Sequence, residues 1–103
     1  MENIKMKNKV AIGVLAYNEE LHIEQVLNDI CQLEVPIFVI NDSSTDGTSD
    51  ILKNLEKKLD FNVIENDKNI GAGSSTLKLL ETVKSKGFKY LLKVDGDNQF
   101  KLS

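Results

Sequence analysis

Residues 35–40 read Val-Pro-Ile-Phe-Val-Ile and run directly into the polar sequence Asn-Asp-Ser-Ser at 41–44. A short, nearly continuous apolar run is typical of a strand buried on both faces, as in a parallel sheet. The same pattern recurs three times, at 10–15 before Tyr17-Asn18-Glu19, at 61–64 before Glu65-Asn66-Asp67, and at 90–94 before Asp95-Gly96-Asp97. The repetition predicts four strands of one parallel sheet.

Segments with helical spacing separate these four runs. Asn18 is expected to cap the first helix, and the order β-α-β-α-β-α-β leaves crossovers long enough for parallel strands. The pattern therefore predicts an α/β fold, an open, mostly parallel sheet with helices on both faces. The expected apolar stripes are Ile23, Val26, Leu27, Ile30 and Cys31, then Ile51, Leu52, Leu55 and Leu59, then Thr76, Leu77, Leu80 and Val83.

Length and composition describe a single domain spanning 1–103, with 41% hydrophobic and 28% charged residues, as in a soluble globular protein. Thirteen basic against sixteen acidic side chains give a net charge of −3, which does not favour a nucleic-acid surface. The single cysteine excludes an internal disulfide and a zinc site built from several cysteines. No secretory leader pattern is present, so we expect a cytoplasmic location. A phosphorylated ligand would need a metal cation or helix N-termini to offset the acidic charge.

Polar clusters follow the strands, at the edge where ligands bind in open parallel sheets. Asp95 and Asp97 should project to the same side, with Gly96 leaving room for backbone or ligand, and can share a hard cation such as Mg²⁺ or Mn²⁺. Gln99 can contact the same ligand. An ordinary acidic turn is the alternative for this Asp-x-Asp.

The other clusters allow both functional and structural interpretations. Asp42 is the candidate to accept hydrogen bonds from a ribose or a base, whereas Ser43, Ser44, Asp46 and Thr48 favour turn and capping roles. Tyr17 and Glu19 can border a planar base, or serve as a half-buried aromatic and a helix-terminal charge. The loop at 68–75 offers free N–H groups to anions but lacks a dinucleotide or P-loop signature. His22 is assigned no role.

Taken together in order and spacing, these clusters resemble the inverting glycosyltransferases of family 2, which have the GT-A fold. The family pattern Pro-x-Tyr-Asn-Glu reads Leu15-Ala16-Tyr17-Asn18-Glu19, and Asp-Asp-x-Ser-x-Asp-Gly-Thr begins here with Asn41-Asp42. An Asn-x-Gly loop follows at 69–71, and Asp95-Gly96-Asp97 supplies the metal motif. Asn98-Gln99 looks like the branch that transfers sugars to polyprenyl phosphates. The resemblance covers residues 9 to 99.

The resemblance implies a role for each matching residue. Asp95 and Asp97 would hold Mg²⁺ or Mn²⁺ on the diphosphate of a UDP- or GDP-linked sugar, with Gly96 and Gln99 beside them. The general base and the acceptor site belong, in the family, to the half that follows the Asp-x-Asp, so no catalytic residue is named here. The implied nucleoside pocket consists of Leu15, Ala16, Tyr17, Glu19 and Asp42.

The expected function is therefore donor binding for transfer of a sugar, with inversion, to an acceptor hydroxyl or phosphate. A non-catalytic nucleotide-binding or interaction module and a nucleotidyltransferase are the alternatives. An incomplete sheet would leave strand edges and apolar helix faces uncovered, so either a homo-oligomer or poor solubility is expected for the isolated chain. Contact with a membrane or a lipid-phosphate acceptor through a later part of the protein stays open.

Overall fold

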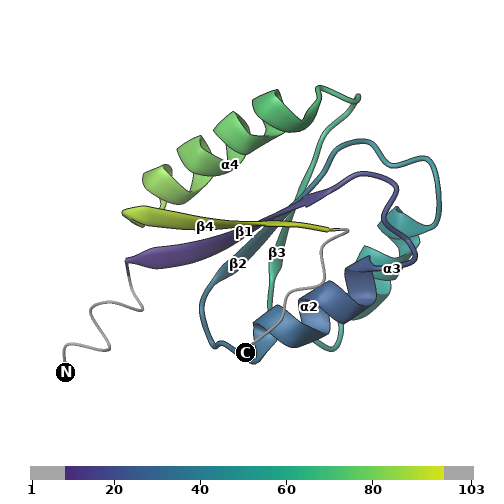
Figure 1. Ribbon diagram of the computed structural model, residues 1–103, viewed down its shortest axis with the longest axis horizontal. Helices are drawn as coiled ribbons and strands as arrows, with labels where there is room; N and C mark the ends of the chain where they lie inside the picture. Colours follow the sequence, from purple (N-terminus) through teal and green to yellow (C-terminus); the bar gives the residue numbers. More distant parts are fainter. Residues whose placement is uncertain (1–8, 97–103) are drawn as a thin grey trace.

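The computed structural model describes residues 9–96, which form a four-stranded, fully parallel sheet in the order β3-β2-β1-β4 (Figure 1). The central strands pair so that Ala16 lies opposite Asn41, and Leu15 lies opposite Asp95 on the other side. The polar residues that end the strands therefore meet at one edge, as the sequence predicted. The strands are β1 (Val10–Ala16), β2 (Ile37–Asn41), β3 (Asn62–Glu65) and β4 (Tyr90–Asp95).

Helices cover both faces of the sheet, which confirms the predicted α/β architecture. Helices α2 (Ile23–Cys31) and α3 (Thr48–Leu55) lie on one face and α4 (Ala72–Ser85) on the other (Figure 1). The larger core lies under α2 and α3, and Cys31 packs against it as predicted. The smaller core, under α4, consists of Ala11, Phe38, Ile40, Leu79 and Val83.

The buried face of α4 differs from the predicted stripe. Ser75, Leu79 and Val83 are buried, whereas Leu77 and Leu80 are 62% and 46% exposed. A Cβ atom at Gly13 would lie 2.7 Å from the Leu91 side chain and 3.2 Å from the Leu79 side chain, so the missing side chain on β1 leaves space for both leucines. The buried face of α4 therefore includes Leu79 and a serine that the apolar pattern could not indicate.

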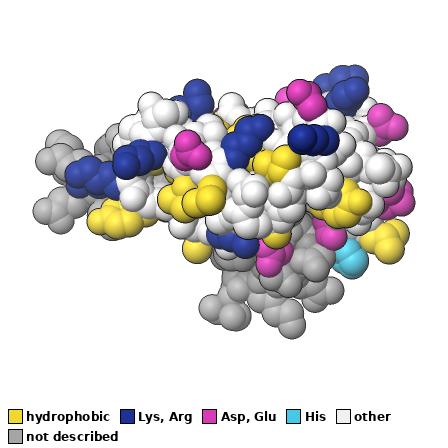
Figure 2. Space-filling model, turned by 90° about the horizontal axis from the view of Figure 1, so that it is seen from above, with side chains coloured by type: hydrophobic (Ala, Val, Ile, Leu, Met, Phe, Trp, Pro, Cys, Tyr) yellow, Lys and Arg dark blue, Asp and Glu magenta, His cyan; other side chains and the backbone are white. Residues whose placement is uncertain are grey.

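Strand β4 forms one edge of the sheet within the described part of the chain, and large apolar side chains are exposed around it. These side chains are Tyr90 and Leu92 on the strand and Leu77 and Leu80 on α4. Figure 2 looks onto the α4 side, where hydrophobic side chains lie among lysines. The expected homo-oligomer stays a prediction. None of the helices in residues 9–96 has the length and apolar character needed to cross a membrane.

Candidate donor-binding site

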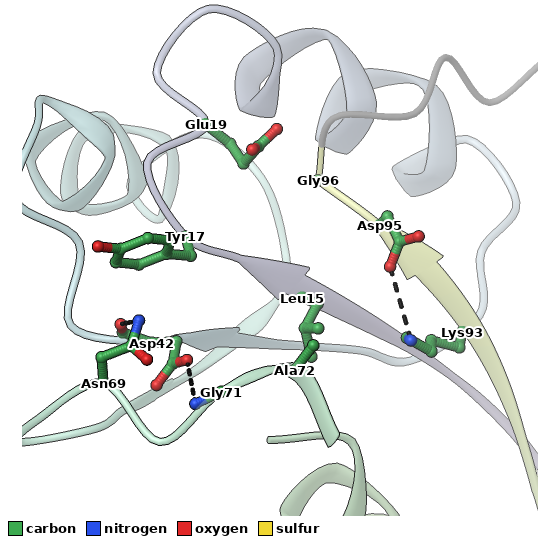
Figure 3. A pocket seen from close by; sticks show the side chains of 10 residues that line it. All are labelled: Leu15, Tyr17, Glu19, Asp42, Asn69, Gly71, Ala72, Lys93, Asp95 and Gly96. Atoms are coloured by element: carbon green, nitrogen blue, oxygen red, sulfur yellow. Dashed lines mark hydrogen bonds and ion pairs between the residues drawn. The ribbon is translucent and has the colours of Figure 1, made fainter. Parts of the chain in front are cut away.

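A pocket of about 510 Å³ opens at the carboxyl ends of β1, β2 and β4, beside the start of α4 (Figure 3). Strand ends of a parallel sheet converge here because every crossover returns the chain to the same edge. The clusters that the sequence singled out therefore share one cavity. Its lining residues are Leu15, Tyr17, Glu19, Asp42, Asn69, Gly71, Ala72, Lys93, Asp95 and Gly96.

Asp42 lies at the base of this pocket and is only 3% exposed. Its Oδ1 atom accepts hydrogen bonds from Asn66 Nδ2 at 3.0 Å and from the Ile70 N–H at 2.8 Å, and its Oδ2 atom accepts one from the Gly71 N–H at 3.0 Å. Burial would raise the pKa of this carboxyl, but these donors and the nearby Lys78 ammonium outweigh it and lower the pKa. Asp42 is thus held as a carboxylate.

The sequence predicted that the glycine-rich loop before α4 offers free N–H groups to an anion, but two of these groups are already bonded within the protein. The N–H groups of Ile70 and Gly71 both donate to Asp42. Gly71 has φ of +89°, a conformation that side-chain-bearing residues rarely adopt, and this turn directs its N–H to the carboxylate. A protein carboxylate therefore already occupies this end of α4, and the loop offers an anion less than predicted.

Asn66 is a buried residue of this site that the sequence did not single out. Besides Asp42, its amide nitrogen donates to Ser75 Oγ at 3.2 Å, and its Oδ1 accepts a bond of 2.6 Å from Lys78 Nζ. The Asn66 N–H bonds the Asn41 carbonyl at 3.0 Å, which ties β3 to β2. The backbone and side chain of this one residue thus connect the ends of two strands to α4, and only its place directly after the third strand could have indicated it.

The loop that carries Tyr17 and Glu19 is fastened to the turn at 44–48. Asn18 Oδ1 accepts a bond of 2.7 Å from the Thr45 N–H, and the Glu19 N–H donates to Thr48 Oγ1 at 2.8 Å. The predicted helix cap at Asn18 is therefore wrong, because α2 begins only at Ile23 and the Asn18 side chain serves the neighbouring loop.

The turn at 44–48 has the structural role that the sequence favoured. Asp46 Oδ1 accepts bonds from the Thr48 N–H at 2.9 Å and from Thr48 Oγ1 at 2.6 Å, at the start of α3. Ser44 Oγ donates to Asn41 Oδ1 at 2.6 Å. The loop at 17–19 and the turn at 44–48 thus form one hydrogen-bonded unit next to the pocket.

Asp95 lies on the opposite side of the pocket, next to Lys93. The Lys93 Nζ atom is 3.7 Å from Asp95 Oδ1, and the two side chains are 41% and 47% exposed. At Gly96 a Cβ atom would lie 2.8 Å from the Leu15 carbonyl oxygen, and the Gly96 N–H donates to that same oxygen. The room that Gly96 leaves is therefore used by the backbone of β1.

The predicted metal ligand Asp97 and the predicted ligand contact Gln99 lie outside the described residues. Within residues 9–96, no cluster of three or more His, Cys, Asp or Glu side chains could hold a metal ion. The pocket offers the Asp95 carboxylate at this end, and the Glu19 side chain lies near Gly96. A carboxylate is the ligand type that Mg²⁺ prefers, with water and substrate phosphates usually completing its coordination.

Six of the residues that the sequence proposed line the pocket, namely Leu15, Tyr17, Glu19, Asp42, Asp95 and Gly96. Ala16 is not among the lining residues, because its side chain packs into the core under α2 and α3. The structure adds Lys93, which the sequence interpretation missed although residues two apart on a strand face the same side.

The family model for glycosyl transferase family 2 matches residues 11–102 of this sequence, almost the whole chain. The chain belongs to glycosyl transferase family 2. The match extends across all four clusters, including Asp95 and the residues that follow it.

Similar proteins include YdaM of Bacillus subtilis strain 168, named a probable glycosyltransferase, which is 39% identical over 82 residues. The poly-beta-1,6-N-acetyl-D-glucosamine synthase of Staphylococcus epidermidis is 31% identical over 91 residues. These matches cover 73% and 85% of this chain but only 20% and 21% of the two relatives. The chain thus spans about a fifth of their length.

Among solved structures, S. aureus TarS in complex with UDP-GlcNAc superposes with a TM-score of 0.69 at 28% identity. The superposition covers 86% of this chain and 26% of that protein. The likeness extends through most of the described fold and supports the GT-A architecture that the family resemblance implies.

Proposed function

We propose that residues 1–103 form the donor-binding part of a glycosyltransferase that uses a UDP- or GDP-linked sugar. The observation that carries the proposal is the convergence of the strand-end clusters on one pocket beside α4. The structure of TarS, to which 86% of this chain is similar, has been solved in complex with UDP-GlcNAc. Transfer to an acceptor would need residues beyond those described, since no general base is assigned among residues 9–96.

The nucleoside would lie between Tyr17, Leu15 and Asp42. An ionised carboxylate offers about four acceptor positions, and protein donors use three of them at Asp42. The remaining position, on Oδ2, can accept a base N–H or a ribose hydroxyl. Because the loop at 69–71 fixes the carboxylate, little ordering of that side chain would oppose binding.

The diphosphate would lie toward Asp95. Asp95, together with Asp97, would hold Mg²⁺ or Mn²⁺ there, because carboxylate oxygens suit these hard cations. Such a cation, when bound, stabilises the negative charge that develops on the departing nucleoside diphosphate. The transfer itself would invert the sugar's anomeric configuration, as in the inverting glycosyltransferases that the sequence resembles.

Isothermal titration calorimetry tests the donor-binding proposal. UDP, GDP and UDP-GlcNAc are titrated into the protein with and without Mn²⁺, and into the Asp95→Ala and Asp97→Ala variants. The affinity for the nucleotides should increase in the presence of Mn²⁺. Each variant should lower this affinity by about tenfold or more, because one charged ligand of the cation is lost. Asp60→Ala is the matched control, because Asp60 lines a different pocket, beside Cys31 and Pro36. Failure of the wild-type protein to bind any of the three would contradict the proposal.

A further inference from the structure

The charges around the pocket are unfavourable for a diphosphate. Among the lining residues within 9–96, the carboxylic acids are Glu19, Asp42 and Asp95, and the one basic side chain is Lys93. The chain as a whole also carries a net charge of −3. A ligand with two phosphates therefore needs specific positive groups at the point where the phosphates lie.

Backbone N–H groups before a helix are a common source of positive potential, and two of them are already used by the protein at this site. The start of α4 faces the pocket, but the Ile70 and Gly71 N–H groups donate to Asp42. This carboxylate offsets the positive end of the helix. Within the described residues, Lys93 is therefore the group best placed to offer a phosphate a full positive charge.

The position of Lys93 suits that role. Lys93 and Asp95 are two residues apart on β4 and project to the same side of the sheet. Figure 3 shows the ammonium end of Lys93 directed into the pocket, toward Asp95 and near Leu15. At 3.7 Å from Asp95 Oδ1 and 41% exposed, the lysine is held by a long ion pair that is easily exchanged. Its flexible four-carbon stem lets the ammonium move to a nearby anion.

We propose that Lys93 is a phosphate-binding residue of the donor site and pairs with Asp95 only until the donor arrives. On donor binding the Lys93 ammonium would leave the carboxylate and donate to a diphosphate oxygen, and Asp95 would then be one of the residues that hold a divalent cation. Lys93 therefore contributes to affinity for the diphosphate and not for the nucleoside. This inference rests on the proposed donor-binding function.

The test compares UDP with uridine as calorimetric probes, in the presence of Mn²⁺. The Lys93→Met variant should bind UDP about 3- to 10-fold more weakly, because one partly screened charged contact is lost. Its affinity for uridine should be unchanged. Lys93→Arg should restore most of the UDP affinity. Lys89→Met is the charge-matched control, since Lys89 is an exposed lysine beside β4 that does not line this pocket. It should bind UDP like the wild type.

A second measurement uses Mn²⁺ alone, followed by electron paramagnetic resonance. Removing the ammonium that pairs with Asp95 should strengthen Mn²⁺ binding in Lys93→Met by about 2- to 5-fold, since exposed ion pairs are weak. Equal UDP affinity in Lys93→Met and wild type would overturn the inference alone, as would a parallel loss of UDP and uridine binding. If the wild type binds neither UDP nor uridine, the proposed function fails as well.

Discussion

Replacing Asp42 with alanine should destabilise the fold and loosen the loop before α4. The carboxylate is 3% exposed and accepts three hydrogen bonds, from Asn66, Ile70 and Gly71. Alanine leaves all three donors without this acceptor, two of them backbone N–H groups. The same substitution removes the one carboxylate that anchors β2 to the loop at 69–71.

The magnitude follows from the number of contacts and their charge. A hydrogen bond to a charged group contributes about 1.5–3 kcal/mol, and the three share one carboxylate, so their contributions are not additive. Removing a buried carboxylate also recovers its desolvation cost. We therefore expect Asp42→Ala to lower the free energy of unfolding by about 2–4 kcal/mol. The isosteric Asp42→Asn keeps one acceptor oxygen and should cost about 1–2 kcal/mol.

Urea unfolding followed by circular dichroism measures these differences, and amide hydrogen exchange locates them. Exchange of the Ile70 and Gly71 N–H groups should accelerate in Asp42→Ala more than exchange in the core of β1. Asp67→Ala, which removes an exposed carboxylate from the same loop region, is the control and should change stability by less than about 0.5 kcal/mol. A stability loss in Asp42→Ala as small as in this control, with unchanged exchange at Ile70 and Gly71, would refute the reasoning.

The depressed pKa of Asp42 adds a pH dependence with a definite sign. A carboxyl whose pKa is lower in the folded than in the unfolded state stabilises the fold above its unfolded pKa, and this contribution is lost as pH falls through the folded value. The stability difference between wild type and Asp42→Asn should therefore be constant above about pH 5 and shrink below about pH 4. A difference that stays constant down to pH 2.5 would contradict the assignment.

Two further pairs of variants test the packing around the site. Gly96→Ala places a methyl group 2.8 Å from the Leu15 carbonyl oxygen and should lower the free energy of unfolding by about 1–3 kcal/mol. Gly73→Ala adds a methyl group where nothing lies within 4 Å and should raise the free energy of unfolding by up to about 1 kcal/mol. Leu79→Ala empties a fully buried position and should cost about 3 kcal/mol, against less than about 0.5 kcal/mol for the exposed Leu77→Ala. Thermal and urea unfolding measure both pairs, and equal effects within either pair would contradict the packing described.

The fold was predictable because its signal is local and repeated. Each strand is a short apolar run with a polar end, and the stripes at 23–31 and 51–59 matched the buried faces of α2 and α3. The stripe of α4 was wrong at Leu77 and Leu80 and right at Val83, because apolar residues at 77, 79, 80 and 83 permit two helix faces. Contacts between distant parts of the chain decide between the two faces, as in the packing of Leu79 beside Gly13 on β1.

The site was predictable in its main acidic and aromatic residues, since parallel strands bring their ends together. The hydrogen bonds between clusters were not, because each joins residues about 25 or more positions apart, as in the pairing of Asn18 with Thr45. The hydrogen bonds from Ile70, Gly71 and Asn66 to Asp42 belong to the same class. A local sequence motif shows which polar groups are present but not which of them form hydrogen bonds with one another.

The most direct test of donor binding in this pocket is a titration of ¹⁵N-labelled protein with UDP and Mg²⁺, followed residue by residue in amide NMR spectra. The largest shifts should fall on the lining segments at 15–19, 69–72 and 93–96, and saturation should follow one binding curve. The pocket beside Cys31 and Pro36 serves as an internal control and should show little change. Shifts concentrated there, or none at millimolar UDP, would contradict the assignment of the donor site.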